Sequence, residues 1–155
     1  MSPQPCTPLT RGPSAHYPLY YFIPSFTEDG EFMVVHEETD NDVQLCRLHI
    51  SSGECIPLTS GKTQRAGWAR WCTDSMTGIY NHLSALNVQS EEVWWFESPP
   101  VQPQLLQVKA RHLRTLASRD ILERPGRLSI GQATFSPDGS LFAFIHADAE
   151  TFYPR

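Results

Sequence analysis

Two short apolar runs in the chain follow an Asp-Gly pair, and both stand in the same local phrase. Residues 25–30 read SFTEDG and precede the apolar run 32–35, while residues 134–139 read TFSPDG and precede the apolar run 141–145. The phenylalanines of the two phrases are 109 positions apart. An Asp-Gly pair between β-rich runs is a strong hairpin signal because glycine accepts the positive φ of a tight reversal. The pattern therefore predicts two hairpin tips at equivalent places of a repeat.

The residues after the first tip continue with strand-like patterns. Residues 31–37 and 43–50 read as strands, and the second of these alternates between apolar and polar positions with a period of two. Residues 51–54 have the composition of a turn, and residues 55–59 read as a short strand. Together with a first strand over the aromatic residues that precede the tip, residues 20–59 are predicted to form four antiparallel strands.

A second repeated phrase supports this unit. CTPLTRG at residues 6–12 returns as CIPLTSG at residues 55–61, which is 49 positions later. Internal repeats of 20–50 residues are typical of solenoids, propellers and arrays. Because the second copy forms the outer strand of the unit 20–59, the first copy is predicted to be the outer strand of a preceding unit.

Residues 67–117 read as a degraded copy of the unit, and residues 128–155 as the start of a further one. A Pro-rich loop is expected at 98–103, and 118–127 is expected to connect to the next unit. A helix over 113–122 is an alternative, since its leucines are partly compatible with a 3.6-residue period. The strands of the degraded unit are predicted at residues 68–73, 78–80, 92–96, 105–110 and 113–117.

Units of 40 to 50 residues with four antiparallel strands are typical of β-propeller blades, in which each sheet packs face to face on its neighbours. The predicted fold class is therefore all-β. Closure of a propeller takes about four to eight blades, and the chain of 155 residues holds two to three predicted blades. We expect an incomplete propeller whose open blade edges favour self-association.

Composition excludes several classes of partner. The formal net charge is −5 and the pI is about 5.6, so the basic surface typical of nucleic-acid binders is not expected. No apolar run approaches the length of about 20 residues that crosses a membrane. No signal-like segment is found at the N-terminus, which favours a cytoplasmic location. The four cysteines form no CxxC pair and are expected to be buried small hydrophobes.

The aromatic lead-in HYPLYYFIPSFTEDG at residues 16–30, together with VQLCRLHISSGECIPLT and FSPDGSLFAF, resembles the N-terminal portion of the oligogalacturonate lyases. These enzymes are seven-bladed propellers akin to TolB-type propellers. The resemblance implies cleavage of oligogalacturonides by β-elimination in pectin degradation, a part of carbohydrate metabolism. It also implies a divalent, manganese-like metal held by a histidine cluster. The histidines of this chain are widely separated, and none of them matches the expected metal ligands.

The resemblance also indicates which rim of the blades would bind a ligand, namely the rim opposite the Asp-Gly tips. The candidate substrate-binding residues there are His16, Tyr17, Arg65 and Trp68. An arginine is suited to grip a galacturonate carboxylate, and an aromatic ring can cover the apolar face of a sugar. Packing between blades is the alternative for His16 and Tyr17, and a solvated loop charge is the alternative for Arg65.

The remaining aromatic residues are predicted to be structural. Tyr20, Tyr21 and Phe22 are expected to belong mostly to the core of an inner strand. Trp94 and Trp95 are consecutive in a strand, so they must face opposite sides, and burial against the two adjacent blades explains both.

Two functions remain open at this point. The chain is either part of an oligogalacturonate lyase-like enzyme that is inactive alone, or a non-catalytic TolB-like propeller segment that binds a protein or another ligand. A propeller belonging to a peptidase is a third reading, which no Gly-x-Ser-x-Gly motif supports.

Overall fold

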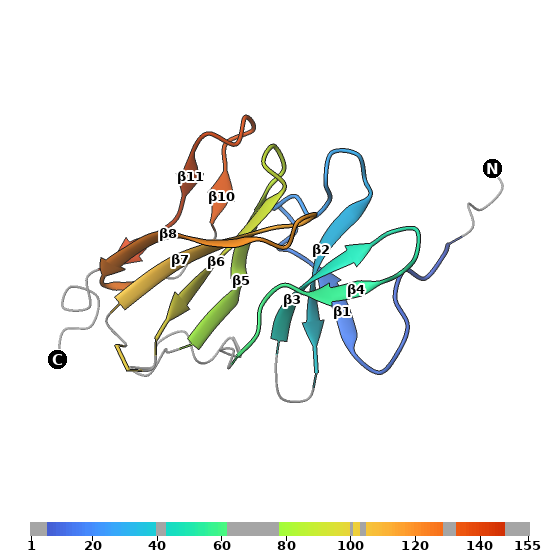
Figure 1. The fold of residues 1–155 in the computed structure, drawn as a ribbon, viewed down its shortest axis with the longest axis horizontal. Helices are drawn as coiled ribbons and strands as arrows, with labels where there is room; N and C mark the ends of the chain where they lie inside the picture. The colour runs from blue at the N-terminus through green and yellow to red at the C-terminus, as the bar shows by residue number, and fades with distance from the viewer. Residues whose placement is uncertain are drawn as a thin grey trace.

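The computed structural model describes residues 6–39, 43–61, 78–99, 101–102, 105–128 and 133–147. Within these ranges the chain forms two four-stranded antiparallel sheets and two short two-stranded ladders, and it contains no helix (Figure 1). The predicted all-β class and the four-stranded antiparallel unit are therefore confirmed.

The first sheet has its strands in chain order, which is the topology of a propeller blade. Its two central strands pair over seven positions, from Phe32 opposite His49 to Glu38 opposite Val43. The strands are β1 (Ala15–Pro18), β2 (Phe32–Glu38), β3 (Val43–His49) and β4 (Cys55–Pro57).

The first strand of this sheet differs from the prediction. It was expected to begin at Tyr20, but the paired residues are those of β1, and after a turn only Phe26 bridges to Met33. Local hydrogen bonds explain the turn: the Leu19 amide donates to Ser25 Oγ at 3.0 Å, and the Ile23 amide donates to the Tyr20 carbonyl at 2.7 Å. These bonds satisfy groups that a continuous strand would offer to β2.

The predicted outer strand at residues 6–12 is also absent from the structure. These residues match β4 and the residues that follow it in sequence, yet a strand exists only where a second strand accepts and donates its backbone hydrogen bonds. No described strand pairs with them. The two copies still share their bends, and Gly12 and Gly61 have φ values of 115° and 120°, so only the strand pairing is missing from the first copy.

The second sheet also has its strands in chain order (Figure 1). Residues 78–80, predicted as a second strand, begin its long first strand, while the proposed first strand at 68–73 lies outside the described residues. Its strands are β5 (Gly78–Asn87), β6 (Glu92–Ser98), β7 (Leu105–His112) and β8 (Ser118–Pro125).

The predictions for the end of this sheet were wrong. Residues 113–117 form a turn, neither a strand nor the start of a helix, and the expected connection at 118–127 contains β8. The turn is closed by the His112 amide, which donates to the Ala117 carbonyl, and Leu116 has a φ of 59°. A left-handed residue ends regular structure, so the leucine spacing that suggested a helix instead marks a tight reversal.

The C-terminal residues repeat an arrangement seen in the first sheet, where pairing with β2 is interrupted by a turn after β1 and resumes at Phe26. Phe135 pairs with Phe142 as Phe26 pairs with Met33, so the two pairs are related by the same offset of 109 positions. The predicted hairpin at the second Asp-Gly pair is therefore confirmed. The ladders are β9 (Arg127–Leu128) with β12 (His146–Ala147), and β10 (Thr134–Phe135) with β11 (Phe142–Ala143).

The two Asp-Gly tips have the same hydrogen-bond network. In the first tip, Asp29 Oδ1 accepts from Thr27 Oγ1 at 2.7 Å and from the Glu31 amide at 3.0 Å. In the second tip, Asp138 Oδ1 accepts from the Ser136 hydroxyl and from the Ser140 amide. Both tip glycines have a φ near +70°. The motif [ST]-x-D-G thus encodes the turn locally, through side chains that bond to the adjacent backbone.

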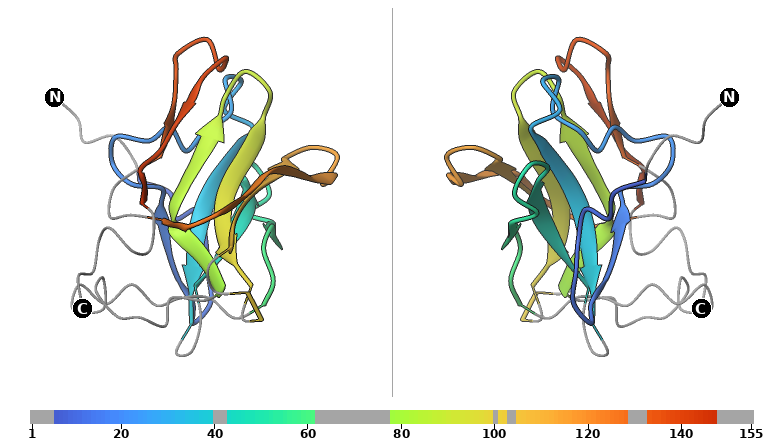
Figure 2. Two further views of the ribbon diagram at one scale, coloured as in Figure 1. Left: turned by 90° about the vertical axis from the view of Figure 1, so that its left-hand side faces the viewer. Right: turned by 90° about the vertical axis from the view of Figure 1, so that its right-hand side faces the viewer.

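The sheets pack face to face through two apolar clusters, and a third cluster lies on an outer face. One cluster joins the two complete sheets and includes Val34, Leu45 and Trp95. A second cluster joins the second sheet to the β10–β11 hairpin, called the third hairpin below, through Phe96 and Phe142. The third cluster, which contains Cys46, lies on the opposite face of the first sheet. The two views of Figure 2 show β1 and the β10–β11 hairpin on one side and the turn between β7 and β8 on the other, an arrangement typical of consecutive propeller blades.

Candidate functional site

Residues 19–25, which we call the aromatic turn, place two aromatic rings in solvent. The side chains of Tyr21 and Phe22 are 74% and 77% exposed, so the prediction that they belong to the core was wrong. Tyr20 is half-buried and packs on the cluster between the two sheets. Two adjacent exposed aromatic side chains are uncommon, and such apolar patches mark interaction sites.

The rings of the aromatic turn contact one another and are held from both ends. The ring centroids of Tyr20 and Tyr21 are 4.2 Å apart, those of Tyr21 and Phe22 are 4.1 Å apart, and the Tyr20 hydroxyl donates to the Tyr21 hydroxyl at 2.9 Å. Leu19 and Ile23 on either side are buried in the core. The exposed rings are therefore mounted on an anchored piece of backbone.

The aromatic turn lies on the inner side of the blades. Figure 2 shows it projecting on the side of the β10–β11 hairpin and away from the turn between β7 and β8. The sequence carries one signal that was overlooked: three consecutive aromatic residues do not alternate with polar ones, as a half-buried strand requires, and Pro24 follows them.

His16 and Tyr17 are neighbours on β1, and they face opposite sides of the sheet, as successive strand residues do. His16 pairs with Glu37, and its Nε2 atom lies 3.6 Å from Glu37 Oε1. This nitrogen is buried and makes no hydrogen bond among the described residues. The two candidates are therefore adjacent in sequence, but the structure does not bring their side chains to one site.

Tyr17 stacks on His36, which is buried in the same sheet. The ring centroids are 4.9 Å apart with an interplanar angle of 21°. Burial raises the pKa of Tyr17 to about 12, and the Glu38 carboxylate beside its hydroxyl adds to the shift. The phenol is thus held in its neutral form, and its ring contributes to packing.

Arg65 and Trp68, the other two candidates, lie outside the described residues and stay predictions. Among the residues that the structure describes, no group of three His, Cys, Asp or Glu side chains could hold a metal ion. The same part of the chain contains no helix of the length and apolarity needed to cross a membrane.

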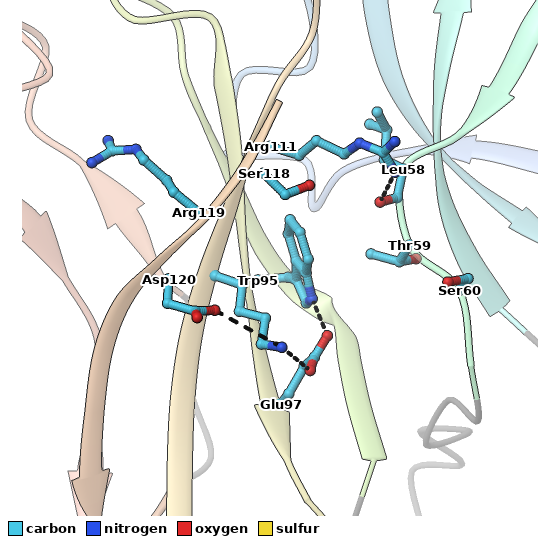
Figure 3. A pocket seen from close by; sticks show the side chains of 10 residues that line it. Leu58, Thr59, Ser60, Trp95, Glu97, Arg111, Ser118, Arg119 and Asp120 are labelled. Atoms are coloured by element: carbon cyan, nitrogen blue, oxygen red, sulfur yellow. Dashed lines mark hydrogen bonds and ion pairs between the residues drawn. The ribbon is translucent and has the colours of Figure 1, made fainter. Parts of the chain in front are cut away.

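A polar groove of about 440 Å³ opens between the residues after β4 and the second sheet (Figure 3). Trp95 Nε1 donates to Glu97 Oε1 at 2.8 Å, and Lys109 Nζ lies 3.0 Å from Glu97 Oε2. Arg111 donates to the Leu58 carbonyl at 2.9 Å. The cations of the groove are already paired with protein oxygens, so an anionic ligand would have to displace these partners. We assign the groove to polar packing between the sheets.

The rim that carries the hairpin tips is held by arginines. Arg114 binds the carboxylates of Asp29, Glu31 and Glu91, and these carboxylates raise its pKa. Arg47 of the first sheet donates to the Leu113 carbonyl, in the turn after β7 of the second sheet, at 2.7 Å. This rim is therefore occupied by contacts between the two sheets.

The predicted packing of the tryptophan pair is confirmed. Trp95 is buried between the two complete sheets, whereas Trp94 faces the third hairpin. The ring centroid of Trp94 is 4.9 Å from that of Phe135 and 4.9 Å from that of Phe142. Both indoles therefore contribute to packing between neighbouring elements.

The cysteines follow their predicted role only in part. Cys46 is buried and Cys55 is half-buried, but Cys6 is exposed, so the expectation of a buried small hydrophobe was wrong for Cys6. Cys72 lies outside the described residues.

Sheets of four antiparallel strands in chain order, packed face to face with their first strands on one side, define consecutive blades of a β-propeller. No family model and no curated protein sequence matches the chain. Among solved structures it is similar to oligogalacturonate lyase from Vibrio parahaemolyticus, with a TM-score of 0.66, 17% identity, and coverage of 94% of this chain and 34% of that one.

An oligogalacturonate lyase in complex with manganese is similar to the same degree, with a TM-score of 0.66, 16% identity and the same coverage. TolB from Acinetobacter baumannii has a TM-score of 0.48 and 17% identity over 76% of this chain and 24% of its own. The chain spans about a third of the length of the lyases. At these identities the likeness establishes the fold, and the resemblance found in the sequence is confirmed at that level.

Proposed function

We propose that the chain forms the N-terminal blades of an oligogalacturonate lyase-like propeller, in which it takes part in binding oligogalacturonides that are cleaved by β-elimination. The observation that carries the proposal is the match of 94% of the chain to two oligogalacturonate lyases at a TM-score of 0.66. The sequence motifs that resemble the same enzymes are an independent support.

The chemistry of β-elimination explains why we expect the chain to be inactive alone. The proton at C5 of a galacturonate lies beside a charged carboxylate, so its removal requires a base and a cation that neutralises the developing charge. A manganese ion would supply that charge in the lyase whose structure contains it. The described residues offer no group of ligands that fits such an ion, and we assign them no step that depends on a metal.

The role that fits the described residues is substrate binding at the aromatic turn. Ligand sites combine aromatic surfaces with a few polar groups. Tyr21 presents an exposed ring with a hydroxyl, and Phe22 presents an exposed apolar ring beside it. The C–H face of a pyranose can cover such a ring, and the anchoring of the turn limits the entropy that binding would cost.

Binding is tested with trigalacturonate, followed by the changes it causes in the NMR signals of the chain. We expect weak binding that Tyr21→Ala and Phe22→Ala reduce at least fivefold. Val101→Ala is the matched control, because it removes another exposed apolar side chain, in the loop between β6 and β7. Equal binding by all three variants and the original chain would exclude the aromatic turn as the contact.

Cleavage is tested separately through the ultraviolet absorbance of unsaturated products, with oligogalacturonate and Mn²⁺. The chain alone should give no product. A hybrid in which the chain replaces the corresponding third of the V. parahaemolyticus lyase should give product. A folded hybrid that binds oligogalacturonate without cleaving it would exclude the lyase role and leave the non-catalytic binding segment as the function.

A further inference from the structure

Cys46 and Cys55 are brought together by the register of the first sheet. In the β3–β4 ladder Cys46 lies opposite Pro57 and Leu48 lies opposite Cys55, so the two cysteines are diagonal neighbours on one face. Both are free thiols, and Cys55 packs against the apolar cluster that contains Cys46. Their sequence separation matches no redox motif, which is why the sequence did not reveal the pair.

The two thiols have different surroundings. Cys46 is completely buried, and its Sγ donates to Glu37 Oε2 at 3.2 Å. Cys55 is only half-buried, at the first position of the three-residue strand β4. A reagent from solution therefore has access to Cys55, whereas Cys46 is reached through Cys55 and is supplied with a proton acceptor in Glu37.

The contact between the thiols differentiates them in the same direction. Cys46 beside it lowers the pKa of Cys55. The contact with Cys55 and burial raise the pKa of Cys46. Since the thiolate is the nucleophile, Cys55 is the sulfur that attacks first.

We propose that Cys55 and Cys46 form a dithiol that disulfide oxidants such as glutathione disulfide convert into a cross-strand disulfide. The Cys55 thiolate attacks one sulfur of glutathione disulfide, which forms a mixed disulfide and releases one glutathione thiolate. Cys46 then transfers its proton to Glu37, and its sulfur attacks the Cys55 sulfur and releases the second glutathione. Two thiols are oxidised and one glutathione disulfide is reduced to two glutathione molecules. This inference does not depend on the proposed function.

The local backbone permits the small movement that the new bond requires. Diagonal neighbours lie about 7–8 Å apart between Cα atoms, whereas disulfides span about 4.4–6.8 Å. Cys55 is the first residue of β4, which pairs with β3 at only three positions. Few ladder bonds therefore oppose a small approach of the Cys55 end of β4 to β3. The disulfide would fasten this short outer strand to its neighbour.

The modification is tested in a chain that carries Cys6→Ser and Cys72→Ser, so that only the pair remains. Incubation with glutathione disulfide should remove two hydrogens from the intact mass, and dithiothreitol should restore them. Arg47 lies between the two cysteines, so trypsin separates them. The oxidised protein should yield one disulfide-linked pair of tryptic peptides, residues 12–47 and 48–62. The same peptide pair should appear from the chain with all its cysteines.

Single variants in that background test the order of the two steps. Cys46→Ser should accumulate one glutathione on Cys55, because the second thiol is missing. Cys55→Ser should react at least tenfold more slowly, because Cys46 is buried. A protein that stays reduced, or two single variants that take up glutathione at equal rates, would overturn the proposal.

Discussion

Arg114, in the turn after β7, binds the carboxylate of Asp29 in the first hairpin tip and so connects the two complete sheets. The same guanidinium binds Glu31 and Glu91, and its central carbon lies 5.1 Å from the centroid of the Phe32 ring. Individual exposed ion pairs contribute little. A planar guanidinium shared by three carboxylates instead restricts how the first hairpin tip can move relative to the turns of the second sheet that carry Glu91 and Arg114.

The Asp29 carboxylate gives the stability of the chain a dependence on acid pH. The backbone amide of Glu31, then the Thr27 hydroxyl and Arg114, lower the pKa of Asp29 to about 2 from an ordinary value of 3.8. A lowered folded-state pKa means that the stabilisation is complete above about pH 4 and is lost as the pH falls through 2. In urea unfolding between pH 5 and pH 2, the free energy of unfolding should therefore fall more steeply with decreasing pH for the original chain than for Asp29→Asn. Asp120→Asn, an exposed carboxylate of β8, is the control and should retain the steep loss.

The two tip glycines should differ in their response to alanine. Both have a φ near +70°, but a Cβ at Gly30 would meet open space, whereas a Cβ at Gly139 would lie 2.5 Å from Asn87 Oδ1. We expect Gly30→Ala to cost about 1 kcal/mol, from the left-handed backbone alone. Gly139→Ala should cost more, as measured by thermal unfolding. The additional loss of stability caused by Gly139→Ala, relative to Gly30→Ala, should become smaller when Asn87 is also replaced by alanine. An unchanged difference would contradict the steric explanation.

The apolar cluster between the two complete sheets should be the main source of their mutual stability. Leu45 is completely buried in that cluster. Leu45→Ala should lower the free energy of unfolding by about 2–5 kcal/mol, because it removes buried methyl groups and leaves a cavity. Val101→Ala, at an exposed residue, should change it by less than about 0.5 kcal/mol. Equal effects in urea unfolding would show that the sheets do not share a core.

Self-association should depend on the third hairpin more than on the outer strands. β4 has three residues and ends at Pro57, and β8 is largely exposed and charged, which are features that discourage edge-to-edge pairing. Leu141 and Ile145 are 69% and 51% exposed. We expect concentration-dependent association in sedimentation experiments, reduced by Leu141→Ser with Ile145→Ser. A monomer at all concentrations would contradict the expectation, and association that the double variant leaves unchanged would locate it elsewhere.

The sequence predicted best where a structure depends on adjacent residues. The hairpin tips were predicted from Asp29, Asp138 and the glycines that follow them, because their hydrogen bonds close within a few positions. Of the two central strands of the first sheet, one was predicted from the apolar run after the tip and the other, at residues 43–50, from its alternation. The first strand of that sheet and β8 were misplaced, because strand limits depend on which distant segment supplies the hydrogen-bond partners.

The candidate site was predicted less well for a related reason. His16 and Tyr17 were assigned to the rim that would bind a ligand, but both belong to β1, whose pleat directs them to opposite faces. Tyr21 and Phe22 were assigned to the core from their apolar character, and the structure exposes both. The apolar character of a side chain indicates that its burial is favourable, whereas the neighbouring strands determine whether a buried position exists for it.

The sequence by itself determined the all-β class, the repeat of about 50 residues and the two Asp-Gly tips, because these follow from local turn chemistry and from the period of the strands. Only the tertiary structure decided that Arg114 joins three carboxylates, that the aromatic turn faces solvent and that Cys46 meets Cys55. Each of these contacts depends on strand register or sheet packing, which brings together residues whose spacing in the chain carries no signal of their proximity.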